Sequence, residues 1–185
     1  IYGVTDITEE SARNIVIAWR RKNLIIVKVW AKIQEAMIDI LLDVKKQVRV
    51  GKIVMFKKYD YLLVRLPSGR HLTYYQPKLS ADYEVSYMGQ NSFKGNKWER
   101  LKTYGGKLVE NLCQSVARDI MAENMLLIDK SGYEIISTVH DEVICEAPKE
   151  FGTYKELSSL LATQPKWADG LPLKAEGYEA QRYKK

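Results

Sequence analysis

The sequence predicts an α+β protein, an antiparallel sheet with packed helices, on three observations. Residues 8–22 and 24–44 repeat apolar side chains at the period of a helix. Residues 48–104 instead hold short β-prone runs that are separated by turn residues. With 185 residues, 46% of them hydrophobic, the chain is long and apolar enough to bury a core. We therefore expect three parts, which cover residues 1–46, 47–104 and 105–185.

The charge and the cysteines narrow the class of protein. The chain holds 29 Lys and Arg against 23 Asp and Glu, a net charge of +6, which suits a polyanionic partner such as nucleic acid. Cys113 and Cys145 both lie in apolar periodic segments, where a thiol behaves as a small hydrophobe. A reduced, intracellular setting is therefore expected.

The ends and the apolar runs of the chain predict neither a membrane segment nor a leader. The longest apolar run has only a few residues, whereas a bilayer crossing needs about 20. The first residues do not resemble a signal sequence. Because the chain begins with Ile1 and not with Met, we expect it to be a piece of something longer.

The first two helices are predicted to pack as a pair. Thr8 is a suitable N-cap, and Glu9 and Glu10 suit the positive end of the helix dipole. The apolar positions of the first helix share one face, and those of the second helix form one stripe. They are Ala12, Ile15, Val16 and Trp19 in the first, and Trp30, Ile33, Met37, Ile40, Leu41 and Val44 in the second. We interpret the Trp and Met residues as core and not as a cofactor site.

The middle third is predicted to be an antiparallel β region. In Leu66-Pro67-Ser68-Gly69-Arg70, Pro67 supplies the fixed φ and Gly69 the permissive φ that a turn needs. The strands on either side of this turn should therefore form a hairpin. Many tyrosines here alternate with Lys and Arg. Two interpretations remain open, because such rings and cations can stack on bases and pair with phosphates, or can simply pack across strands.

A third helix, over residues 107–128, follows Gly105-Gly106 and is stopped by Gly132. At 100° per residue, a narrow polar arc lies opposite an apolar side. The arc consists of Lys107, Asn111, Gln114 and Arg118. An ordinary amphipathic helix explains the division but not the amides, whereas amides suit the acceptors of a nucleic-acid minor groove. Both interpretations remain open.

The most informative stretch is residues 138–146. β-branched residues on both sides predict two paired strands that bury their apolar faces, with His140-Asp141-Glu142 at the bend. A polar bend is commonly only a solvated turn. The alternative is a site whose titratable side chains are held on a rigid hairpin.

Several motifs in this order resemble the C-terminal palm of family A DNA polymerases, the DNA polymerase I type. Val139-His140-Asp141-Glu142 is similar to the third conserved motif of that family, and the helix with Asn111 and Gln114 precedes it at the expected distance. Other runs look most like phage or prophage members, and the last is similar to the final palm strand. These are Leu66-Pro67-Ser68-Gly69-Arg70, Thr103-Tyr104-Gly105-Gly106-Lys107, Ala117-Arg118-Asp119 and Leu171-Pro172-Leu173-Lys174-Ala175-Glu176-Gly177.

The resemblance assigns roles to individual residues near the hairpin. It implies that Asp141 is a ligand of two catalytic Mg²⁺ ions, that Glu142 supports it, and that His140 contacts the primer end. It also places Asn111 and Gln114 in the minor groove at the newly formed base pair.

Two positions depart from the pattern of the family. Lys107 stands where many relatives have Arg, which keeps the charge but not the forked geometry. Tyr2 in Ile1-Tyr2-Gly3 superficially matches the nucleotide-binding end of the fingers helix, but the spacing to the next segment is too short for that role. Arg118 matches no contact position of the family and is left out of the predicted site.

The resemblance implies template-directed transfer of dNTPs to a primer 3′-hydroxyl in DNA replication, in the cytoplasm of a bacterial or phage-infected cell. Residues 1–46 would then be the end of the fingers region and residues 105–185 the second half of the palm. Two Mg²⁺ ions about 3.5–4 Å apart would bind through carboxylates and phosphates. No Asp-Tyr-Ser run is present to supply the second carboxylate ligand, so we expect it outside this chain, and the chain alone should not polymerise.

Two further interpretations are kept. A non-catalytic DNA-binding module derived from a polymerase would explain the charge and the basic, aromatic β region. A metal-dependent phosphohydrolase would need several His ligands, whereas the chain has only His71 and His140.

Overall fold

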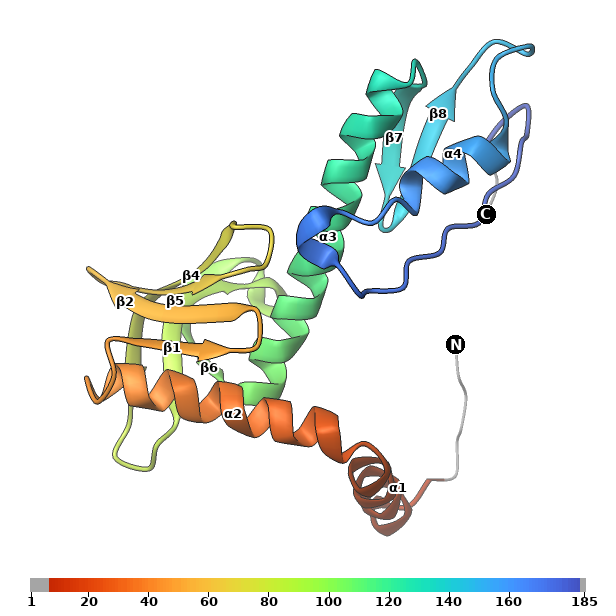
Figure 1. Ribbon diagram of the computed structural model, residues 1–185. Helices are drawn as coiled ribbons and strands as arrows, with labels where there is room; N and C mark the ends of the chain where they lie inside the picture. Colours follow the sequence, from red (N-terminus) through yellow and green to blue (C-terminus); the bar gives the residue numbers. More distant parts are fainter. Residues whose placement is uncertain (1–6, 184–185) are drawn as a thin grey trace. The chain divides into compact units, whose positions relative to one another are not determined.

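The computed structural model describes residues 7–183, and in this range it confirms the α+β class. Four α-helices, two short 3₁₀ helices, a six-stranded antiparallel sheet and a two-stranded hairpin make up the regular structure of the described residues (Figure 1). Tyr2, discussed above, lies outside the described range. Across residues 7–183, no helix combines the length and the apolar composition that a membrane crossing requires.

The chain divides into two compact units. Of the described residues, the first unit holds 7–65 together with His71–Asn111, and the second holds Leu66–Arg70 together with 112–183. The short Leu66–Arg70 turn thus belongs to a different unit from the two strands that it connects.

The sheet of the first unit is a meander in which each strand pairs antiparallel with the next. A tight turn allows neighbouring strands to pair in this way. In the turn after Arg65, Leu66 N–H donates to the Arg70 carbonyl at 2.8 Å, and Gly69 takes a φ of 90°, which glycine adopts easily. The strands are β1 (Gln47–Val50), β2 (Ile53–Lys58), β3 (Tyr61–Arg65), β4 (His71–Leu79), β5 (Val85–Asn91) and β6 (Lys97–Thr103).

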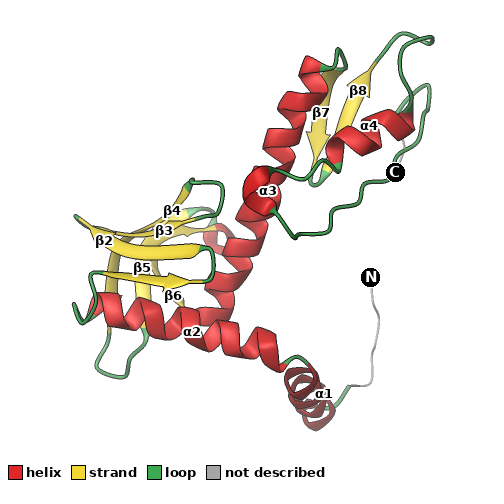
Figure 2. Ribbon diagram, in the orientation of Figure 1, coloured by secondary structure: helices red, strands yellow, loops and turns green. Residues whose placement is uncertain are grey.

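One face of this sheet packs against α2 (Leu24–Leu41) and forms the core (Figure 2). Leu62 and Val64 in β3 point to that face and are buried, as are Met37 and Ile40 on α2. Successive side chains of a strand point to opposite faces, so the residues between them lie on the other side of the sheet.

The first helix, α1 (Glu9–Lys22), begins where the sequence predicts, because the Thr8 hydroxyl accepts a hydrogen bond from Ser11 N–H at 3.2 Å. None of its residues is buried. Trp19 stacks on Trp30 of α2 at 5.8 Å and is 44% exposed, so the prediction that it lies in the core is wrong, whereas it is confirmed for Met37. Apart from this contact with α2, the other described elements leave the apolar side of α1 open to solvent.

The third helix, α3 (Gly105–Lys130), starts with a close approach to α2. Gly105 N–H donates to Gln34 Oε1 at 2.6 Å, and a Cβ at Gly105 would lie only 2.1 Å from the Trp30 carbonyl oxygen. Gly105 is therefore required by space and not only by its flexibility.

The second unit packs β7 (Glu134–Val139), β8 (Glu142–Glu146) and α4 (Tyr154–Leu161) with the rest of α3. Asn124 of α3 is buried and donates to the carbonyls of Leu161 and Thr163, both at 2.8 Å. These two bonds use the amide nitrogen and fix the end of α4 on α3, whereas the amide oxygen of Asn124 is buried without a hydrogen-bond partner among the described residues.

Three details of this unit differ from the sequence-based expectations. The segment 171–177 is not a strand, because no strand of the described residues pairs with it; instead Gly177 lies close to Ser158 of α4. Cys113 is exposed and Cys145 half-buried, so the first does not behave as a buried hydrophobe. Helix α4 was not predicted.

Candidate functional site

The hairpin of the second unit carries the predicted catalytic residues at its tip. Val139 of β7 pairs with Glu142 of β8, so the turn consists of only two residues, His140 and Asp141. The expected hairpin is confirmed, with the refinement that Glu142 is the first residue of β8 and not part of the bend.

The backbone at this turn has an uncommon conformation. His140 takes a φ of 54°, in the left-handed region that few residues other than glycine adopt, although His, Asn and Asp do so more often than others. His140, Asp141 and Glu142 are all exposed. The tip therefore presents one imidazole and two carboxylates to solvent.

Glu142 has a partner that the sequence did not indicate. Tyr183 Oη donates a hydrogen bond to Glu142 Oε2 at 2.8 Å. This bond to the carboxylate raises the pKa of Tyr183, with smaller contributions from burial and from the charge of Glu142. The two residues are far apart in the sequence, and no local pattern links them.

The sides of the hairpin are less buried than predicted. Val139, Val143 and Ile144 are half-buried, and Ile136, next to a shift of register between Ile135 and Ser137, is 54% exposed. The two strands of this hairpin pair with no further strand of the described residues, so their side chains are less enclosed than in a larger sheet. The shift of register turns the side chain of Ile136 outward.

The metal-binding capacity of the described residues is limited. In residues 7–183, no three or more His, Cys, Asp or Glu side chains are grouped so that they could hold a metal ion. Asp141 offers carboxylate oxygens of the kind that Mg²⁺ prefers, and Glu142 offers a second carboxylate that already accepts from Tyr183.

The predicted groove-reading residues lie on one side of α3, as the helical period requires. Lys107 and Gln114 are exposed, and Asn111 is half-buried. Asn111 Nδ2 donates to Tyr74 Oη at 3.2 Å, while burial raises the pKa of Tyr74. Asn111 therefore has a structural contact that the sequence did not indicate.

The predicted site residues are divided between the two units. Lys107 and Asn111 belong to the first unit, whereas Gln114 and the hairpin tip belong to the second. Within the second unit the structure brings His140, Asp141 and Glu142 together with Tyr183.

Two of the motifs noted in the sequence meet at Asp119. Asp119 Oδ2 accepts from Ser68 Oγ at 2.5 Å, and Asp119 Oδ1 accepts from Arg70 Nε at 2.6 Å. Arg70 also donates to the Ser115 carbonyl at 3.1 Å. The Leu66–Arg70 turn is thus clamped to α3, so these residues have a structural role.

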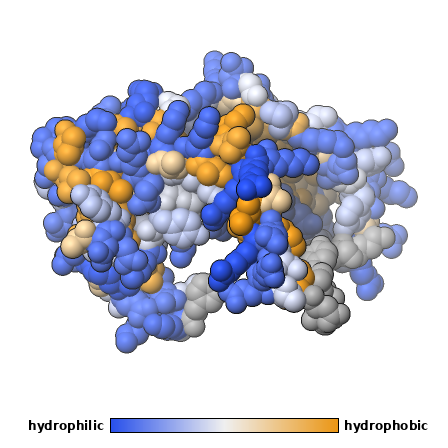
Figure 3. Space-filling view, turned by 90° about the horizontal axis from the view of Figure 1, so that it is seen from below, coloured by the Kyte–Doolittle hydropathy of each residue, from blue (hydrophilic) through white to orange (hydrophobic). Residues whose placement is uncertain are grey.

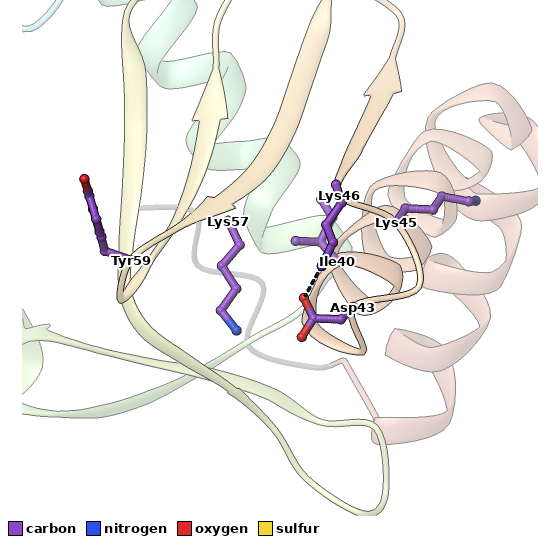
Figure 4. Close-up of a pocket in the computed structure, with 6 residues that line it drawn as sticks. All are labelled: Ile40, Asp43, Lys45, Lys46, Lys57 and Tyr59. Carbon is purple, nitrogen blue, oxygen red and sulfur yellow. Dashed lines mark ion pairs between the residues drawn. The ribbon is translucent and has the colours of Figure 1, made fainter.

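A separate basic hollow lies where α2 ends (Figure 4). It has a volume of about 240 Å³ and is lined by Lys45, Lys46 and Lys57 among others. Lys45 bonds to Asp39 at 2.7 Å, and Lys46 pairs with Asp43 at 3.6 Å. The charges of these two lysines are therefore largely compensated locally.

Comparison with known proteins relates the chain to a DNA polymerase. That relative is the DNA polymerase of Bacillus phage SP02, which is 35% identical over 184 residues. The match covers 97% of this chain but 28% of the phage protein, so the chain spans little more than a quarter of the length of its relative. No family model matches the chain, and no solved structure matches it significantly.

Proposed function

We propose that this chain is the part of a family A DNA polymerase that holds the end of the fingers region and the second half of the palm. The similarity to a phage DNA polymerase along almost the whole chain carries the proposal. The tight hairpin that presents Asp141 supports it, because a two-residue turn between paired strands holds a carboxylate more firmly than a longer loop does. The substrates would be dNTPs and a primed DNA template.

Asp141 is the proposed metal ligand of this chain. Mg²⁺ held there would neutralise the charge that develops on the phosphate oxygens during nucleotidyl transfer. Glu142 would support Asp141 from the next position, with its carboxylate oriented by Tyr183. His140 would contact the primer end from the same turn.

The exposed side of α3 is proposed to hold the new base pair. Asn111 and Gln114 would offer amides to minor-groove acceptors, which differ little between base pairs and so permit contact without strong sequence preference. Lys107 would add charge next to the phosphates. The bond to Tyr74 would hold the Asn111 amide in place.

The second carboxylate ligand would come from polypeptide that corresponds to the rest of the phage relative. We therefore expect the purified 185-residue chain to show no dNTP incorporation on a primed template. Incorporation by this chain alone would contradict the proposed division of the metal site.

The test of the assignment is Asp141→Asn in a complete polymerase that contains this chain. Removal of the charge should lower the extension rate by about 100-fold or more, because electrostatic stabilisation at the reacting phosphate is lost. Primer-template affinity, measured by fluorescence anisotropy, should remain close to that of the unaltered polymerase.

The matched control is Glu146→Gln, which removes an exposed carboxylate from the other end of the same hairpin. This change should leave the extension rate within about twofold, since a solvated charge at that distance is screened. Equal extension rates for the two variants would contradict the assignment of Asp141 as a metal ligand. Tight DNA binding by a complete polymerase that never extends a primer would instead support a non-catalytic DNA-binding module.

A further inference from the structure

The face of the six-stranded sheet that points away from α2 has an unusual set of side chains. The register places six cations on this open face, and the strand positions that point to it hold no Asp or Glu. The cations are Arg49, Lys58, Arg65, Lys78, Arg100 and Lys102. The only acidic residue within the six strands is Glu99, which pairs with Gly89 and therefore points to the opposite face.

Most of these charges are not compensated. Lys102 pairs with Glu84 at 2.6 Å, in a contact where both side chains are more than half exposed. Within residues 7–183, the other five form no ion pair with a carboxylate. All six cations are exposed and therefore accessible on this face, whereas Val54, which lies between Arg49 and Arg65, is buried.

Three aromatic rings form a row across the same face. Tyr61 of β3 lies 5.1 Å from Tyr75 of β4, and Tyr75 lies 6.4 Å from Trp98 of β6, between ring centroids. Tyr61 is 40% and Trp98 55% exposed. Cross-strand packing explains the contacts between the rings, but it does not explain why two large rings remain open to solvent.

We propose that this open face binds single-stranded nucleic acid, with bases stacked on Tyr61, Tyr75 and Trp98 and phosphates paired with the surrounding cations. Unpaired bases expose the faces that rings can stack on, whereas paired bases in a duplex do not. Rings on an open antiparallel sheet can hold two or three bases in this way. Because the strand positions of this face hold no Asp or Glu, they would not repel the phosphates of a polyanion. The strands of this face belong to the first unit and Asp141 belongs to the second, and the proposal stands without the polymerase assignment.

The test measures binding of a fluorescently labelled oligo-dT of roughly 20 nucleotides, longer than one site, to the purified chain. Fluorescence anisotropy is recorded without nucleotide and without magnesium, so the result does not depend on Asp141. A variant with Tyr61→Leu and Trp98→Leu should bind about tenfold more weakly or worse, since each stacked base contributes strongly. Its salt dependence should be unchanged, because no charge has been removed.

Charge reversal provides the second arm and its matched control. Lys58→Glu should weaken binding and flatten the dependence of affinity on salt, because a phosphate contact is lost. Lys57→Glu changes the adjacent residue, which points to the opposite face and lines the hollow of Figure 4. At about 0.15 M salt, Lys57→Glu should alter the affinity for the oligonucleotide by less than about twofold, because distant charges are screened.

Circular dichroism checks that each variant is folded. If the ring variant does not fold, the two lysine variants still test the proposal, because their side chains are exposed and their replacement should not disturb the fold. Unchanged affinity of the folded ring variant overturns the proposal, as do equal effects of the two lysine changes. Equal affinity for a duplex or for a polyglutamate peptide would also overturn it, since the face would then bind any polyanion by charge alone.

Discussion

Asp119 shows how a single residue joins two segments that lie far apart in the sequence. Its two carboxylate oxygens accept from Ser68 and Arg70, and its own side chain is only 10% exposed. A carboxylate with so little access to water must be bonded on both oxygens, because an unmet buried charge is costly. The motif that contains Asp119 is therefore explained by packing.

Asp119→Ala should lower the free energy of unfolding by about 1–3 kcal/mol, since bonds to a charged group are lost and Ser68 is left without its acceptor. The loss should lie toward the lower end of that range because Arg70 is 46% exposed and its ion pair is screened. Urea unfolding followed by circular dichroism gives the measurement. Arg118→Ala, an exposed neighbour, should change the value by less than about 0.5 kcal/mol. Equal losses in the two variants would contradict the clamp.

At the level of elements, the start of α3 is determined by space. Two consecutive glycines begin this helix, but they differ in what a side chain would meet. At Gly105 a Cβ would collide with the backbone of Trp30, whereas at Gly106 it would lie 2.8 Å from the ring edge of Tyr104. A backbone cannot move without shifting α2, but the Tyr104 ring is 63% exposed and can rotate.

Gly105→Ala should therefore lower the free energy of unfolding by about 1–3 kcal/mol, as overpacking does in other cores. Gly106→Ala should remain within about 0.5 kcal/mol of the unaltered chain, since the strain is relieved and alanine favours the helix. Thermal and urea unfolding of both variants distinguish the two positions. A larger loss at Gly106 than at Gly105 would show that α2 does not approach α3 in this way.

Elements with local signals were predictable, and those without such signals were not. The cap at Thr8 and the apolar periodicity gave the start of α1, and β-branched runs gave β7 and β8. Helix α4 has only eight residues, so its periodicity is short, although Thr153 and Glu156 form the beginning of a capping box. Thr153 Oγ1 does accept from Glu156 N–H at 3.2 Å, and this signal could have found the helix.

For the whole molecule, the distribution of apolar side chains is uneven. Trp19, Ile15 and Ile25 on α1 and the first half of α2 are between 44% and 80% exposed, whereas the second half of α2 lies in the core. Figure 3 views the molecule from the side on which α2 lies in Figure 1 and shows apolar side chains at the surface among polar ones. A helix with one apolar side normally buries it, whereas α1 and the first half of α2 leave apolar side chains open to solvent.

The chain should consequently bind a hydrophobic dye such as anilinonaphthalene sulfonate in its folded state. A variant with Ile15→Lys and Ile25→Lys should reduce the dye fluorescence strongly while it changes the free energy of unfolding by less than about 0.5 kcal/mol, because neither side chain is buried. Leu126→Lys, at an exposed leucine of α3, serves as the control and should reduce the fluorescence much less. Dye binding that is the same in all three proteins would place the hydrophobic surface elsewhere.

The candidate site was predictable in part. The polar triplet between two β-branched runs is a local pattern that predicts the hairpin, which the structure confirms, whereas the role of Asp141 rests on the resemblance to family A DNA polymerases and stays a prediction. Tyr183 was missed because its bond to Glu142 joins residues 41 positions apart. The bond between Asn111 and Tyr74 was missed for the same reason, since helical periodicity shows which side a residue lies on but not what it touches.

By itself the sequence determined the α+β class, the three long helices, the antiparallel β region and the hairpin with Asp141 at its tip. These follow from interactions between residues close in the chain, namely capping, periodicity and turn chemistry. Only the tertiary structure decided that α1 stays exposed, that segment 171–177 is not a strand, that Asp119 is a clamp, and that one sheet face gathers cations and rings. Those features depend on which distant segments pack together, and burial and strand register are set by that packing.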